Sequence, residues 1–116
     1  MSETPYITDV YTGAAEWDQS SFHRFQAGRD PEQVAADDAQ LKKVFSEIAS
    51  PTFKEAYKWA EENGVKFFID HTVQMAGGYY TMGTGVVGIA ARYANRPAMA
   101  GPILTHEIRH AWQDKQ

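Results

Sequence analysis

The stretch Asn63-Gly64-Val65-Lys66-Phe67-Phe68-Ile69-Asp70 divides the chain into a helical part and a part rich in strand residues. Asn63-Gly64 is a typical helix C-cap, because both residues tolerate a left-handed backbone. The six residues that follow are mostly β-branched or aromatic, and together they have the length of one strand. The stretch therefore predicts that a helix ends and a sheet begins here, which indicates an α+β domain.

Two helices are predicted before this stretch, and each has its own start signal. Asp30 is a suitable N-cap, Pro31 fits the first turn, and apolar residues then recur at helical spacing, so we expect a helix over 31–49. Ser50-Pro51 repeats the signal, and the second helix is expected over 51–63.

The 116 residues are expected to form a single domain, because compact domains cluster at about 100–150 residues. The predicted helices and strands fall within residues 30–116. Residues 1–29 are expected to form an irregular N-terminal lead-in, in which Tyr6–Tyr11 alternates like a short strand.

Two further strands are predicted around a glycine-rich segment. Gly77-Gly78 precedes Tyr79–Met82, and Gly83-Thr84-Gly85 separates this run from Val86–Ala90. The two runs form either two antiparallel strands or one long strand broken by a glycine bulge. A last helix is expected from Pro102 to Gln113, and it has an apolar face but no stop signal. The sequence thus predicts helices packed on a small mixed or antiparallel sheet.

Composition excludes several classes of protein. The chain has 11 Lys and Arg against 15 Asp and Glu, a net charge of -4 and no basic block, so we expect no nucleic-acid partner. No run approaches the roughly 20 apolar residues of a spanning helix, and the segment Met1–Tyr6 lacks the basic and apolar regions of a secretory signal, so we expect no membrane partner and a cytoplasmic location. The chain has no cysteine, so His, Asp or Glu must hold any metal.

His106-Glu107-Ile108-Arg109-His110 is an H-E-x-x-H motif within the last predicted helix. Residues four apart differ by about 40° around a helix axis, so His106 and His110 can direct both imidazoles at one metal ion. Glu107 lies beside that point, where a carboxylate can take a proton from a metal-bound water and later release it. The alternative is an ordinary amphipathic helix that carries two unrelated histidines, but the apolar flanks favour a half-buried metal helix.

Residues 51–116 resemble zincin-type metallopeptidases, and the resemblance is specific over 104–113. The order of the elements and an H-E-x-R-H-A-x-Q-like motif are similar to those of small bacterial minimal zincins and bacterial metallopeptidase domains. The resemblance implies a zincin-like fold with a C-terminal H-E-x-x-H helix. It also implies Zn²⁺ as cofactor, His106 and His110 as its ligands, Glu107 as general acid/base, and a peptide or protein substrate hydrolysed by a zinc-activated water.

Catalytic zinc needs a third protein ligand, which zincins generally supply from beyond the motif helix. Within this chain the candidates are Asp114, His71 and His23, each with a plain structural alternative. The chain ends six residues after His110, and no metzincin extension follows the motif. We therefore expect a piece of a longer protein whose zinc binding and peptidase activity are weak or absent in isolation.

Tyr79 and Tyr80 are candidates for a substrate cleft, where a hydroxyl could donate to an oxyanion. The alternative is that one ring lies in the core and the other in solvent, as adjacent strand positions dictate. An extended substrate is expected to pair with an edge strand between Tyr79 and Ile89. The rival to a peptidase is a catalytically incomplete binding or structural module, and a protease acting once on one partner is a third possibility. The sequence leaves the oligomeric state open.

Overall fold

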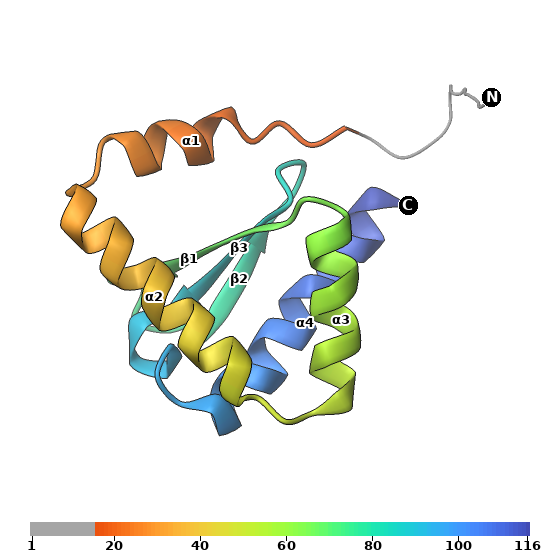
Figure 1. Cartoon of the computed structure of the whole chain (residues 1–116). Coiled ribbons are helices and arrows are strands. Elements are labelled where there is room, and N and C mark those ends of the chain that lie inside the picture. The colour runs from red at the N-terminus through yellow and green to blue at the C-terminus, as the bar shows by residue number, and fades with distance from the viewer. Residues whose placement is uncertain (1–15) are drawn as a thin grey trace.

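The structure is a computed structural model that describes residues 16–116, so the strand predicted at Tyr6–Tyr11 lies outside the described residues. The described part forms a mixed α+β fold in which helices pack on a small three-stranded sheet (Figure 1). In chain order the elements are α1 (Ser20–Ala27), α2 (Pro31–Glu47), α3 (Pro51–Glu62), β1 (Lys66–Asp70), β2 (Gly78–Thr81), β3 (Val86–Ala90), the 3-10 helix η1 (Ala91–Tyr93) and α4 (Pro97–Lys115).

The sheet has the strand order β1-β3-β2, so β2 is an edge strand. β1 pairs with β3 in parallel, with Phe67 opposite Val87, and β2 pairs with β3 in antiparallel orientation, with Tyr80 opposite Val87. The glycine-rich segment is the turn between β2 and β3, where Gly83 and Gly85 have φ angles of 79° and 65°. Of the two alternatives for this region, two strands is confirmed.

Helices α2, α3 and α4 build the core with one face of the sheet. Val87 and Ile89 of β3 are fully buried in it, and α3 and α4 lie side by side (Figure 1). The buried cluster that joins these elements consists of Leu41, Val44, Ile48, Phe53, Ala60, Val65, Ile69, Val87, Ile89, Ala94, Ala100, Leu104, Ile108 and Ala111. A single core of this kind holds α4 rigidly against the sheet.

The predicted start signals of α2 and α3 are confirmed. The Asp30 carboxylate accepts a hydrogen bond from the backbone N–H of Glu32 at 3.1 Å, and the Ser50 hydroxyl accepts one from Phe53 at 3.2 Å. Each bond satisfies a backbone donor that the first helical turn leaves free. Gly64 has a φ angle of 76° after α3, in the left-handed conformation expected for a helix end.

The expected irregular lead-in is wrong for residues 20–27, which form α1. The Asp18 carboxylate accepts hydrogen bonds from the backbone N–H and the hydroxyl of Ser20, at 3.0 and 2.7 Å, and so begins the helix. Phe22 and Phe25 then pack on Phe68 of β1, with ring centroids at 6.2 and 5.3 Å. The helix was not predicted because two apolar residues in one short helix give only a weak periodic signal, and the residue they pack on is distant in sequence.

The last helix begins earlier than predicted. Pro97 occupies its first turn, and Pro102, the expected start, lies inside the helix. A proline is favoured in the first turn of a helix, because backbone N–H groups there have no helical partner and a residue without one loses nothing. The chain has two prolines five residues apart, and the later one was mistaken for the start of the helix. None of the helices described is both long enough and apolar enough to cross a membrane.

Candidate metal centre

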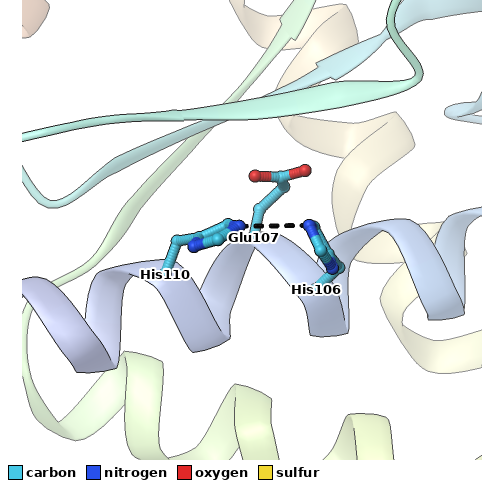
Figure 2. A group of neighbouring side chains, drawn as sticks. All are labelled: His106, Glu107 and His110. Carbon is cyan, nitrogen blue, oxygen red and sulfur yellow. Dashed lines mark hydrogen bonds between the residues drawn. The ribbon is translucent and has the colours of Figure 1, made fainter.

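The H-E-x-x-H motif lies in the second half of α4, where the helix separates an exposed face from the core. His106 and His110 are exposed, whereas Glu107 is only 9% exposed and points toward the sheet (Figure 2). The helical repeat of 3.6 residues explains this division, because Leu104, Ile108 and Glu107 turn inward when the two histidines turn outward.

The two imidazole rings converge, as their four-residue spacing predicts. The Nε2 atoms of His106 and His110 are 3.1 Å apart, and the ring planes meet at 86° with centroids at 4.6 Å. Two nitrogen ligands at tetrahedral angles around one zinc ion lie about 3.3 Å apart. The separation of the two nitrogens is therefore close to that of two ligands on one metal ion. In the absence of metal, the same approach allows one ring to donate a hydrogen bond to the other.

Glu107 completes a group of three potential metal-binding side chains. One ligand atom from each of His106, Glu107 and His110 can be chosen so that all three lie within 4.8 Å of one another. The carboxylate forms no hydrogen bond with any residue between 16 and 116. Although most of the residue is buried, its carboxylate oxygens still reach solvent, so they are available to a metal ion or a water molecule.

Gly78 of β2 explains how Glu107 comes to lie so close to the sheet. A Cβ atom at Gly78 would lie 2.7 Å from Cγ2 of Ile103, 2.9 Å from the carbonyl oxygen of Gly88 and 3.6 Å from Cγ of Glu107. Only a glycine therefore allows α4 to approach the edge strand at this point. The Gly-Gly pair that precedes the predicted strand thus has a packing role beside the candidate site.

Two side-chain hydrogen bonds form within the motif helix, and one of them orients a histidine ring. Gln113 Oε1 lies 3.3 Å from Nδ1 of His110, so a proton on Nδ1 leaves Nε2 free to bind a metal. The Thr105 hydroxyl donates to the backbone carbonyl of Gly101 at 2.7 Å. Thr105 therefore does not reach the histidine pair through its hydroxyl.

The structure does not bring the three candidate third ligands to the histidine pair. The Asp114 carboxylate accepts hydrogen bonds from the Tyr80 hydroxyl and, at 2.9 Å, from the backbone N–H of Gly83, so it holds the β2–β3 turn. Nε2 of His71 lies 3.1 Å from both carboxylate oxygens of Asp37. His23 lies on the exposed side of α1 against the Phe22 ring. Among residues 16–116, only Glu107 joins His106 and His110 in a metal-sized group.

Tyr79 and Tyr80 point to opposite faces of the sheet, and the hydroxyl of each donates a hydrogen bond to a carboxylate. The Tyr79 hydroxyl donates to Asp70 at 2.5 Å, and the Tyr80 hydroxyl donates to Asp114. Burial and the neighbouring carboxylate raise the pKa of each phenol. Burial alone would raise the pKa of Asp70, but hydrogen bonds from Tyr79 and Thr72 outweigh it and lower the pKa to about 2. Both tyrosines therefore tie elements together, and a role in a substrate cleft stays a prediction.

A second polar cluster, around Asp37, was not foreseen from the sequence. The Asp37 side chain is 7% exposed and forms an ion pair with Arg29 at 2.5 Å. Gln33 donates to the same carboxylate at 2.9 Å, and His71 completes the cluster. Burial alone would raise the pKa of Asp37, but the hydrogen bonds from these three side chains lower it. The four-residue spacing of Gln33 and Asp37 was the only local signal.

The chain was compared with known protein families, with curated proteins and with solved structures, and none of them matched. The chemistry of the site therefore has to be argued from the histidine pair, the buried Glu107 and the strand beside them.

Proposed function

We propose that the chain is a zinc-dependent metallopeptidase of the zincin type, with His106 and His110 as zinc ligands and Glu107 as general acid/base. The observation that carries the proposal is the 3.1 Å approach of two exposed imidazole nitrogens next to Glu107, a largely buried residue whose carboxylate has no partner among residues 16–116. An amphipathic helix with unrelated histidines needs neither feature.

The chain's own residues divide the chemistry between them. A bound zinc ion would supply a Lewis acid that polarises a carbonyl and acidifies a water molecule. Glu107, which lies between α4 and β2, would serve as the group that takes up a proton from the attacking water and releases it to the leaving amine. His110 is held in position through Gln113, and His106 stands one turn away on the same face.

The edge strand β2 offers a place for an extended peptide. β2 pairs with β3 on one side only, so its other side presents backbone N–H and carbonyl groups along Gly78–Thr81. Addition of a peptide strand to such an edge supplies main-chain hydrogen bonds. Because Gly78 lies against Glu107, a peptide bound there would run past the candidate metal centre.

The number of protein ligands determines the zinc affinity that we expect. Two histidines and one carboxylate are the potential ligands in the described part of the chain, and a proton-transfer role for Glu107 leaves only two protein ligands. We expect zinc to bind with a dissociation constant of about 1 μM or weaker, because closed structural sites have four protein ligands and catalytic sites three. Water or a group outside residues 16–116 would complete the coordination.

Substitution of Glu107 by Gln tests the assignment. We expect E107Q to lower zinc-dependent hydrolysis of casein by at least about 100-fold, the usual contribution of a general base, while zinc affinity and folding stay close to those of the parent chain. Glu62→Gln is the matched control, because Glu62 is exposed at the end of α3 and far from the motif in sequence. Proteolysis would be followed by release of labelled fragments and zinc binding by calorimetry.

Two results would contradict the proposal in different ways. Loss of zinc binding in E107Q would make Glu107 a ligand rather than a base. A zinc-loaded parent chain that binds the metal but cleaves no casein would favour the alternative, a binding or structural module with an incomplete site.

A further inference from the structure

A groove of about 490 Å³ is lined by residues of α3 and α4. Its walls are largely apolar. The apolar side chains that line it are Ala56, Trp59, Ile108 and Trp112. The Trp112 residue is 47% exposed, although tryptophan is a large apolar residue that is usually mostly buried. The groove therefore presents aromatic surface that the fold itself leaves uncovered.

The groove continues along α4 towards His106. A second cavity of about 350 Å³ lies beside His106, and Thr52, Thr105 and Arg109 line both cavities. The two hollows thus meet at these three residues and form one path along α4 from His106 to Trp112. A molecule in the apolar groove can therefore extend as far as His106, whereas His110 and Glu107 line neither cavity.

Arg109 stands where the two cavities meet. It is exposed and forms no hydrogen bond or ion pair with any of the residues described. Glu55 lines the apolar groove from the α3 side, but no ion pair joins it to Arg109. A guanidinium without a partner, in a chain of net charge -4, is the natural complement of a carboxylate on a bound molecule.

The geometry points to a specific class of substrate, and this inference rests on the proposed peptidase function for the chemistry that follows binding. The α3–α4 groove binds a bulky apolar side chain of the polypeptide, and Arg109 binds the carboxylate of an Asp or Glu two residues away. We choose a spacing of two because alternate side chains of an extended chain point to the same side, about 6.8 Å apart. Aromatic and arginine side chains of this kind commonly dominate binding surfaces.

Peptide binding to the metal-free chain tests the inference separately from hydrolysis. The probes are the capped peptides Ac-Ala-Phe-Ala-Glu-Ala-NH₂ and Ac-Ala-Glu-Ala-Phe-Ala-NH₂, with Gln in place of Glu and Ala in place of Phe as comparison peptides. Binding is measured with EDTA present, from the NMR shifts of the indole N–H groups of Trp59 and Trp112. We expect at least one Phe–Glu order to shift both signals and to bind at least fivefold more tightly than either comparison peptide.

Variants then assign the carboxylate contact. Arg109→Gln is expected to remove the preference for Glu over Gln, whereas Arg96→Gln, an exposed arginine at the start of α4, keeps it. Equal binding of the Glu and Gln peptides to the parent chain, or no indole shift at millimolar peptide, would overturn the inference. Binding that persists in His106→Ala supports the groove even if zinc binding fails. Hydrolysis without indole shifts would overturn the groove alone.

Discussion

Asp37 and Glu107 are the two buried carboxylates of the described chain, and their surroundings differ. Asp37 receives hydrogen bonds from Arg29, Gln33 and His71, so its charge is compensated and its role is structural. Glu107 receives none from residues 16–116 and lies beside two exposed imidazoles. A carboxylate that no other side chain of the described residues engages, and that lies beside two imidazoles, is the stronger candidate for function.

The Asp37 cluster predicts a dependence of stability on pH. Burial opposes ionisation, but the three hydrogen bonds lower the pKa of Asp37 below its usual value of 3.8. The ionised form therefore stabilises the native state at neutral pH, and this contribution is lost as the pH falls from about 4 through the native pKa. We expect Asp37→Asn to reduce the free energy of unfolding at pH 7 by about 3 kcal/mol, because Arg29 stays buried without a counter-charge.

Urea unfolding at pH 7 and pH 3 checks this prediction. The difference in unfolding free energy between the two pH values should shrink in D37N. Asp38→Asn is the matched control, because Asp38 is the exposed neighbour on α2. An equal loss in D38N, or an unchanged pH dependence in D37N, would contradict the structural role of the cluster.

At the scale of elements, the contact between α4 and β2 decides where the motif lies. Gly78 is a point of close approach, and an added methyl group would overlap Ile103 and the carbonyl oxygen of Gly88. We expect Gly78→Ala to lower the free energy of unfolding by about 2 kcal/mol, because the helix must move away from the strand. Gly28→Ala, where the nearest atom would lie at 3.5 Å, should change stability by less than about 1 kcal/mol.

Thermal and urea unfolding of the two variants would test this contact. If G78A is as stable as the parent chain, α4 does not depend on a glycine at the edge strand. The buried position of Glu107 would then lose its explanation.

At the scale of the whole molecule, local signals predicted most elements. Caps at Asp30 and Ser50 and the glycine after α3 mark helix ends through bonds within a few residues, so they can be read directly. The approach of His106 and His110 follows from helix geometry in the same way.

Contacts between distant residues could not be read from the sequence. His71 contacts Asp37, which is 34 residues away in sequence. Helix α1 packs on the sheet through contacts of Phe22 and Phe25 with Phe68 of β1. No local pattern encodes such a contact, because it depends on how β1 is placed against α1 and α2. The burial of Glu107 is of the same kind, since it depends on how closely α4 approaches β2 at Gly78.

Calorimetric titration with zinc of the parent chain and of single histidine variants tests the central claim most directly. We expect saturable binding of one zinc ion per chain, with a dissociation constant of about 1 μM or weaker. Binding should weaken at least tenfold in both His106→Ala and His110→Ala. It should be unchanged in His23→Ala, the matched exposed histidine on α1. A parent chain that binds no zinc, or H106A and H110A variants that bind it like the parent, would contradict the account.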